Sequence, residues 1–295
     1  MTIREALRSA AERLELHRIS NARLTAEVLL AHLLSVSREY LHAHDDRVLQ
    51  DEESQALENA LCDRIAGVPL QYIVGLQEFY GRHFQVNPSV LIPRPETEHI
   101  IEAVLEIRAI WGQTPSCRIM DVGTGSGCIA VTLALEISDS RVFAGDISEN
   151  ALRVARANAF NLKAQVEFVC MDVMDAIMGP FDIVVSNPPY VAPADRDWLQ
   201  REVRDHEPHV ALFAPDSDGL GIYRKIIQRA GEVLQRGGYL VMEIGIGMED
   251  RVLNLFGEEW DKLPAKTDLQ GIPRTVIAKC RPGTNRRCGA DLPQS

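Results

Sequence analysis

After Trp111, short apolar stretches alternate with longer amphipathic stretches along the chain. The apolar stretches have the length of buried strands, and they cover residues 118–122, 141–146, 166–170, 181–186 and 238–244. Helical spacing falls between them, over residues 127–136, 148–159 and 219–234. Strands that alternate with helices indicate a parallel sheet covered by helices on both faces. We therefore predict an α/β fold that binds its ligands beyond the carboxyl ends of the strands.

The first 70 residues have helical spacing throughout. One helix is predicted over residues 21–34 with Ser20 as its N-cap, and another over residues 51–65, which Gly67 ends. We expect residues 1–70 to form a small helical domain. The sequence is equally compatible with two roles for this domain, namely positioning a substrate and stabilising the rest of the protein.

A stiff connector is predicted over residues 71–95. It contains two short strands, 77–80 and 83–87, followed by a proline-rich segment. Pro93 and Pro95 each fix their own φ and favour extended geometry in the preceding residue. The predicted organisation is therefore a helical domain, this connector and a catalytic domain over 96–280, with a polar tail at 281–295 that we expect to be disordered.

Composition narrows the range of functions. The 295 residues are 46% hydrophobic, and no apolar run approaches the roughly 20 residues of a membrane span. The N-terminus lacks the layout of a signal peptide, so we expect a cytoplasmic protein with no membrane partner. The net charge of -11 repels phosphate, which argues against a nucleic acid as the main substrate. We also expect a monomer.

The cysteines do not indicate a metal site or a disulfide framework. No two of them form a C-x-x-C pair, and we expect reduced and mostly buried thiols. The six positions are Cys62, Cys117, Cys128, Cys170, Cys280 and Cys288.

A glycine-rich loop follows the first predicted strand. Its residues are Gly123, Thr124, Gly125, Ser126 and Gly127. A dinucleotide fingerprint would have its third glycine at position 128, which is Cys128, and the G-K-[ST] of a phosphate-binding loop is missing. The pattern G-x-G-x-G therefore suits an uncharged adenosyl group better than a dinucleotide. The alternative is a tight strand-to-helix turn with no ligand.

Acidic residues end the next two predicted strands. Asp146 lies about 20 residues beyond the glycine loop, where a carboxylate can accept hydrogen bonds from both ribose hydroxyls. Because Ser148 is better placed to cap the following helix, Asp146 is available for a ligand. Asp172 would accept from an adenine amino group, and Val173 would pack on the ring. A solvated turn aspartate is the alternative for Asp172.

The sharpest signal is the run Asn187, Pro188, Pro189 and Tyr190 at the end of the fourth predicted strand. Two consecutive prolines cannot continue a strand, and they leave the Pro188 carbonyl rigidly aimed. The Asn187 side chain adds a second neutral acceptor. The alternative is a purely structural role, as a proline turn capped by Asn187.

Two fixed acceptors match the two hydrogens of an –NH₂ group. An amide nitrogen is a poor nucleophile because its lone pair is delocalised into the carbonyl. Holding both hydrogens raises the electron density of the nitrogen, and aligning it with a methyl donor can lower the barrier by up to roughly 7–11 kcal/mol. Tyr190 would offer a flat face to the planar group and electrostatic benefit near a sulfonium. No catalytic cysteine, histidine or metal is required.

With these motifs in hand, the chain resembles the release-factor glutamine methyltransferase family (HemK-type N5-glutamine methyltransferases). The resemblance extends from the N-terminal helices to about Lys279 and rests on four stretches, of which Pro-Arg-Pro-Glu-Thr-Glu is the most specific. The four stretches are residues 69–81, 91–98, 121–127 and 187–190. It implies a Rossmann-like class I methyltransferase fold, with a mostly parallel seven-stranded sheet and a small helical N-terminal domain.

The resemblance also implies substrates and site residues. The methyl donor would be S-adenosyl-L-methionine, with S-adenosyl-L-homocysteine as product, and the partner would be the Gly-Gly-Gln motif of peptide chain release factors in translation termination. Asn187 to Tyr190 would clamp the glutamine, and Phe79 and Tyr80 would wall its pocket. The cofactor would contact residues 123–127, Asp146, Asp172 and Asn187. Val173 is a departure, because some relatives carry an aromatic residue there.

Three alternatives remain. A related group methylates a glutamine of a ribosomal protein, but it has Pro-Arg-Ser-Pro where this chain has Pro-Arg-Pro-Glu at 93–96. DNA adenine methyltransferases use the same clamp on a flipped base, although the acidic charge and the missing target-recognition insertion argue against that activity. A non-catalytic cofactor-binding module has no need of the clamp.

Several charged residues are left with open roles. Arg94 and Glu96 would either position the partner or form an ion pair that braces the connector. His206, Glu207 and His209 suggest a substrate-gating loop more than a metal site. We expect Glu243, on the last predicted strand, to be a satisfied core carboxylate.

Overall fold

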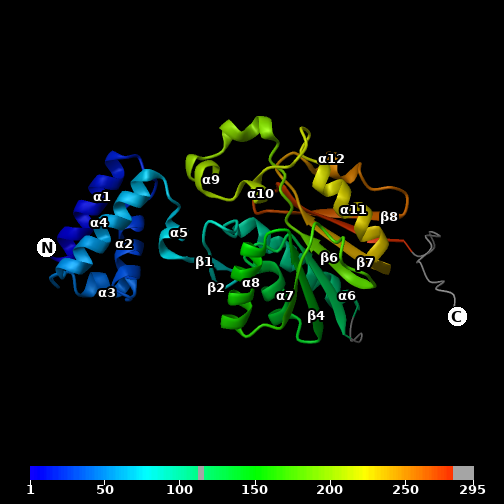
Figure 1. Ribbon diagram of the computed structural model, residues 1–295, viewed down its shortest axis with the longest axis horizontal. Helices are drawn as coiled ribbons and strands as arrows, with labels where there is room; N and C mark the ends of the chain where they lie inside the picture. Colours follow the sequence, from blue (N-terminus) through cyan, green and yellow to red (C-terminus); the bar gives the residue numbers. More distant parts are fainter. Residues whose placement is uncertain (112–115, 282–295) are drawn as a thin grey trace. The chain divides into compact units, whose positions relative to one another are not determined.

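The computed structural model describes residues 1–111 and 116–281 (Figure 1). The chain forms two compact units. One comprises Met1–Leu76 together with Leu199–His206, and the other comprises Gln77–Trp198 and the residues from Glu207 onward. Within the described ranges, no helix combines the length and apolarity that a membrane span requires. Apart from Arg281, the tail predicted to be disordered lies outside the described residues.

The first unit is a helical bundle around its own apolar core. Its helices are α1 (Ile3–Leu16), α2 (Ala22–Leu33), α3 (Arg38–Ala43), α4 (Asp51–Ala66), α5 (Leu70–Val74) and α9 (Arg201–His206). Gly67 ends α4 with φ of +106°, as its sequence position predicts. The predicted cap at Ser20 is wrong, because Asn21 precedes α2 in a left-handed conformation and makes no side-chain cap.

The α9 segment joins this bundle from a distant part of the chain. Glu202 forms an ion pair of 2.8 Å with Arg64, whose side chain is only 10% exposed. Arg201 donates to the main-chain oxygen of Ala66 at 3.3 Å, so α9 is fixed to the end of α4. Nothing in the hydrophobic pattern predicted this association, because polar contacts hold the segment.

The second unit contains a seven-stranded sheet with the order β5-β4-β3-β6-β7-β9-β8. The strands are β3 (Cys117–Val122), β4 (Ser140–Asp146), β5 (Val166–Cys170), β6 (Phe181–Ser186), β7 (Leu234–Glu243), β8 (Trp260–Thr267) and β9 (Pro273–Cys280). The five predicted strands form its parallel part, while β9 pairs antiparallel with β7 and with β8. The α/β fold and the implied mostly parallel seven-stranded sheet are thereby confirmed.

Helices cover both faces of this sheet. They are α6 (Glu98–Trp111), α7 (Cys128–Glu136), α8 (Glu149–Leu162), α11 (Gly221–Val233) and α12 (Glu249–Leu253). The short helix α10 (His209–Leu212) and the 3₁₀ turns η1 (Pro95–Thr97) and η2 (Pro193–Trp198) lie in the connecting segments. A two-stranded hairpin, β1 (Leu76–Phe79) and β2 (Arg82–Gln85), precedes η1. Helices α6 and α7 pack on one face, and α11 and α12 cover the other (Figure 1).

The strands alternate between two apolar cores, which explains their nearly continuous hydrophobic sequences. Ile119 and Ile183 point into the core shared with α6 and α7. Met120 and Val184, one residue later in each strand, point into the core shared with α11. This period of two places successive residues of β3 and β6 against opposite layers of helices.

The order of the strands creates a switch point between β3 and β6. The chain runs outward from β3 through β4 to β5, then returns to place β6 on the other side of β3. Val122, the last residue of β3, pairs with Ser186, the last residue of β6. The Ser186 hydroxyl donates to the Val122 carbonyl at 2.7 Å. The glycine loop and the Asn-Pro-Pro-Tyr segment therefore begin at adjacent, hydrogen-bonded positions.

Cys62, Cys117, Cys128 and Cys170 are free thiols. Cys117 and Cys128 are buried, and burial raises the pKa of each to about 12. Cys62 and Cys170 are exposed, so the expectation of mostly buried thiols is only partly correct. Cys288 lies outside the described residues.

Candidate active site

A cavity of about 340 Å³ opens at the switch point, a size typical of ligand sites. It is walled by the ends of β3, β4 and β6, the proline connector and the segment around α10. Among its lining residues are Leu91, Pro93, Thr97, Gly123, Thr124, Gly125, Ser126, Asp146, Ile147, Met171, Asp172, Val173, Asn187, Pro188, Pro189, Phe213 and Ile222. Gly127, by contrast, does not line it.

The glycine loop is built from left-handed backbone. The φ angles of Gly123, Gly125 and Gly127 are +72°, +55° and +81°, which side-chain-bearing residues rarely adopt. A β-carbon on Gly127 would lie 3.0 Å from that of Ala155, so this glycine permits close packing on α8. A β-carbon on Gly123 or Gly125 would meet nothing within 4 Å. These two positions leave open space for a ligand to approach the main chain.

Asp146 links the end of β4 to this loop. One carboxylate oxygen accepts from the Gly125 N–H at 2.9 Å, and the other accepts from the Ser148 N–H at 2.8 Å. The Ser148 hydroxyl accepts from the Ala151 N–H at 3.2 Å, which confirms Ser148 as the cap of α8. Burial raises the pKa of Asp146, and the main-chain donors oppose that rise. The carboxylate is therefore held at the cavity with lone pairs to spare.

Asp121 is a second acidic residue that the sequence analysis did not single out. It is fully buried and accepts from the Thr124 hydroxyl at 2.6 Å, which ties the loop to β3. Burial raises the pKa of Asp121 to about 7, against the lowering effect of the Thr124 bond. The available signal was an acid at the end of an apolar strand, directly before the glycines.

The wall beyond β5 contains both predicted adenine-binding residues. Asp172 forms a 3.4 Å ion pair with Lys225 of α11, and both side chains are at least half exposed. Val173 has φ of +55°, an outlier for a β-branched residue. Such strain is concentrated at ligand sites. The conformation fixes Val173 on the cavity wall beside Met171.

Asn187 is held by a short chain of side chains. Its Nδ2 donates to the Thr97 hydroxyl oxygen at 3.1 Å, and that hydroxyl donates to a Glu243 carboxylate oxygen at 2.6 Å. Burial raises the pKa of Glu243 to about 7, while the Thr97 bond acts in the other direction. Glu243 thus has the satisfied, buried setting predicted for it. The role of Thr97 was missed, because only the fold brings it to Asn187.

The aromatic residues assigned to the clamp pocket lie elsewhere. Phe79 is 1% exposed and packs edge-on against Phe84 in the core, so the prediction that it walls the cavity is corrected. Tyr80 does not line the cavity either, and its N–H donates to Glu98 at 2.8 Å. The ring of Tyr190 packs beside Gly245, where an added β-carbon would lie 2.9 Å from the ring. The sequence alone did not distinguish aromatic residues of the core from aromatic residues that line the cavity.

The proline connector is braced by a buried acid rather than by its own glutamate. Arg94 forms an ion pair with Glu207, whose side chain is 1% exposed, and the Ile92 N–H donates to the same carboxylate at 3.2 Å. The expected pairing of Arg94 with Glu96 is therefore replaced by one with Glu207. The described residues include no group of three or more potential metal ligands. Glu207 instead holds the connector in place through its bonds to Arg94 and Ile92.

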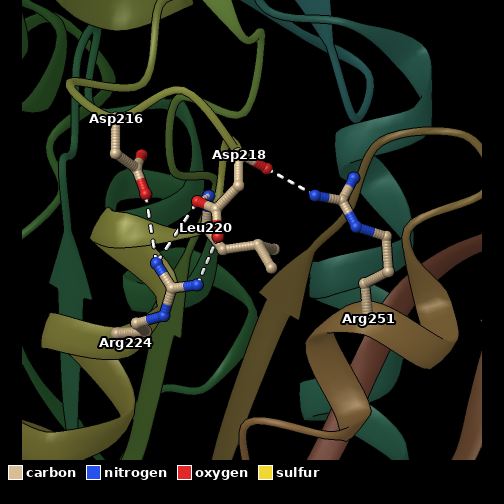
Figure 2. Close-up of polar contacts among 5 residues, drawn as sticks. All are labelled: Asp216, Asp218, Leu220, Arg224 and Arg251. Atoms are coloured by element: carbon tan, nitrogen blue, oxygen red, sulfur yellow. Dashed lines mark hydrogen bonds and ion pairs between the residues drawn. The ribbon is translucent and has the colours of Figure 1, made fainter.

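Another set of ion pairs fixes the loop before α11, as Figure 2 shows. Arg224 pairs with Asp216 at 3.1 Å and also with Asp218, and Arg251 donates to the Asp218 carbonyl at 2.5 Å. The Arg224 hydrogen bond lowers the pKa of Asp218. Since Pro215 lines the cavity at the start of this loop, the cluster stabilises one of its walls.

Known proteins match both parts of the chain. Residues 5–75 match the PrmC N-terminal domain family, and residues 107–204 match the Methyltransferase small domain family. A release factor glutamine methyltransferase of Koribacter versatilis is 45% identical over 281 residues, or 95% of this chain and 99% of the relative. One of Chlorobaculum tepidum is 42% identical and covers 87% of this chain and 90% of its own length.

A solved structure supports the same fold. The 16S rRNA N2 G1207 methyltransferase of T. thermophilus, in complex with AdoMet and guanosine, superposes with a TM-score of 0.50 at 18% identity. The match covers 70% of this chain and 50% of that one, and at this identity it bears on the fold alone. The two curated relatives cover nearly the whole chain at more than 40% identity. On that basis, the chain belongs to the release factor glutamine methyltransferase family.

Proposed function

We propose that this chain transfers a methyl group from S-adenosylmethionine to the side-chain amide nitrogen of the glutamine in the Gly-Gly-Gln motif of peptide chain release factors. The observation that carries the proposal is the pairing of Val122 with Ser186. It sets the open glycine loop and the Asn187 amide side by side at one cavity. A donor site adjacent to a paired-acceptor site is what in-line transfer to an –NH₂ group requires.

The residues around the cavity fit an adenosyl cofactor. The open positions at Gly123 and Gly125 admit a ligand to the main chain, and the Asp146 carboxylate suits ribose hydroxyls. Val173 and Ile222 add apolar walls for an adenine ring, with Asp172 as an acceptor at its edge. Bound there, S-adenosylmethionine would supply an electrophilic methyl group, and S-adenosylhomocysteine would be the product.

The chain itself supplies orientation rather than a strong base. Asn187 and the Pro188 carbonyl would accept the two hydrogens of the glutamine amide and direct its nitrogen toward the methyl group. Because Pro188 and Pro189 cannot join a strand, this segment keeps its position as substrate enters. The nitrogen loses a proton to solvent once the new bond forms. Tyr190 would act by packing under this segment, given its place beside Gly245.

Two other substrates share the chemistry of an –NH₂ group, namely a ribosomal-protein glutamine and an adenine base. The names of the full-length relatives favour the release factor. The net charge of -11 disfavours a DNA substrate. We further propose that the chain acts as a monomer, without a metal.

The test is a substrate panel. The full chain is incubated with methyl-labelled S-adenosylmethionine and a release factor, a ribosomal protein or duplex DNA, and the modified atom is mapped by mass spectrometry. We expect label only on the release factor, at the Gly-Gly-Gln glutamine. Label on the ribosomal protein or on adenine, with none on the release factor, would contradict the proposal.

A further inference from the structure

Two buried side chains lie behind the amide of Asn187. Thr97, in η1, is 2% exposed, and Glu243, at the end of β7, is 4% exposed. Hydrogen bonds of 3.1 Å and 2.6 Å join Asn187 to Thr97 and Thr97 to Glu243. Three elements far apart in the sequence therefore meet behind one amide group.

The direction of these bonds follows from counting protons. A threonine hydroxyl has one proton to donate, and a carboxylate can only accept. With the Thr97 proton given to Glu243, the hydroxyl oxygen presents a lone pair to Asn187. Only the amide NH₂ can meet a lone pair, so Nδ2 faces Thr97 and the carbonyl oxygen faces the other way.

We propose that Thr97 and Glu243 are positioning residues that set the amide orientation of Asn187, so that its carbonyl oxygen and not its NH₂ group meets the substrate. This inference rests on the proposed role of Asn187 as an acceptor for the glutamine amide. It assigns a function to the threonine of the Pro-Arg-Pro-Glu-Thr-Glu element, at residues 93–98. With the amide reversed, two NH₂ groups would face each other and the clamp would repel its substrate.

The same arrangement makes the clamp sensitive to pH. A protonated Glu243 can donate to Thr97, whose hydroxyl then donates to Asn187 and selects the reversed amide. Burial raises the pKa of Glu243 to about 7, while hydrogen bonds from the Thr97 and Asn187 side chains oppose that rise. The charge of Glu96 adds to the rise, and that of Arg274 opposes it. Other titratable groups that face Glu243 are Tyr190, Tyr223 and Cys128. Turnover should therefore fall as the pH decreases through about 7.

The first arm of the test compares threonine variants at saturating substrate. Thr97→Val keeps the shape of the side chain but removes the hydroxyl, and we expect kcat to fall roughly 10- to 100-fold with the Kd for S-adenosylmethionine little changed. Thr97→Ser restores the hydroxyl and should recover most of the turnover. Thr132→Val is the matched control, because Thr132 is equally buried and its hydroxyl has no hydrogen-bond partner among the described residues.

The second arm measures kcat against pH. The unaltered chain should show an acid limb with an apparent pKa near 7, the value to which burial raises Glu243. Glu243→Gln cannot titrate, so it should abolish that limb even if its plateau is lower. Unaltered turnover in Thr97→Val, or an unchanged acid limb in Glu243→Gln, would overturn the inference.

Asn187→Ala, assayed on the same release factor, separates the two proposals. If its turnover collapses while Thr97→Val remains active, only the orienting role is wrong. If Asn187→Ala itself turns over normally, the clamp assignment fails and the inference fails with it.

Discussion

The two sides of the cavity are constructed differently. The glycine loop takes its shape from its own main chain, and the Gly125–Asp146 bond that secures it spans only 21 residues. The amide of Asn187 is held by side chains 90 residues away at Thr97, which in turn bonds Glu243 at a separation of 146 residues. The cofactor side is therefore a local structure, whereas the clamp depends on the whole fold.

The two sides also differ in how strictly their hydrogen-bonding groups must be oriented. Main-chain donors in a tight loop have few alternative positions, so a glycine pattern suffices to build them. An amide side chain has two orientations of nearly equal shape, and only a fixed donor or acceptor selects one. Substitutions on the clamp side should affect turnover, and those on the loop side should affect cofactor binding. Four predictions test that division and the contacts that support each side, and they are given in order of decreasing effect.

Asn187→Ala removes the side-chain acceptor from the clamp. We expect kcat to fall about 10²- to 10³-fold, as for removal of one transition-state hydrogen-bond group. Because the glycine loop does not depend on Asn187, the Kd for S-adenosylmethionine should change little. Single-turnover methyl transfer and calorimetry on the same protein measure the two effects, and a parallel loss of binding would break the division.

Arg94→Ala leaves the buried carboxylate of Glu207 without its charged partner. Breaking such a pair from one side should lower the free energy of unfolding by about 3 kcal/mol, measured in urea. Arg141→Ala is the control, because the Arg141–Glu167 pair has side chains 60% and 51% exposed and should contribute less than about 1 kcal/mol. Equal losses in the two variants would contradict a structural role for the connector brace.

Gly127→Ala and Gly125→Ala distinguish packing from ligand approach. Both force alanine into positive φ, at a cost of about 1–2 kcal/mol, but only Gly127 adds a contact with Ala155. Gly127→Ala should therefore lower the free energy of unfolding more. Gly125→Ala should weaken S-adenosylmethionine binding more, as measured by calorimetry. A reversed order would show that the open space beside Gly125 is not where the ligand lies.

Asp121→Asn tests the buried acid under the loop. Because burial raises the pKa of Asp121 to about 7, its stabilising effect is full below the ordinary pKa of an aspartate and is lost as the pH rises through about 7. The free energy of unfolding of the unaltered chain should fall, relative to Asp121→Asn, by about 1 kcal/mol between pH 6 and pH 7. Urea titrations at several pH values measure this, and parallel curves would refute it.

The parallel part of the fold was predictable because each buried strand carries its own signal. The ranges of β5 and β6 agree with the predicted ones residue for residue, because most residues of both strands are apolar, although only β6 is largely buried. The antiparallel pair β8 and β9 was not located from the hydrophobic pattern. Lysines and Pro264 interrupt β8, and a proline is tolerated there because the strand lies at the edge of the sheet.

The parts of the candidate site that are contiguous in the sequence could be predicted, and the parts that depend on distant residues could not. Glycine spacing and the run of prolines identified the loop and the clamp, because special backbone geometry requires special residues. Thr97 and Asp121 were missed, since a buried hydroxyl or acid has no sequence signature until the fold supplies its partner. Phe79 was misplaced for the converse reason, because an aromatic residue suits a core as well as a cavity wall.

The most direct test of the account is a double-mutant cycle between Asn187 and the substrate glutamine. Release factor with either the natural Gly-Gly-Gln glutamine or glutamate at that position is titrated against the cofactor-saturated chain, with and without Asn187→Ala. Acceptors that hold an –NH₂ group should make the Kd for the glutamate form about 10-fold or more higher than the Kd for the glutamine form in the unaltered chain. This preference should largely disappear in Asn187→Ala. An equal preference in both proteins would contradict the claim that Asn187 recognises the amide.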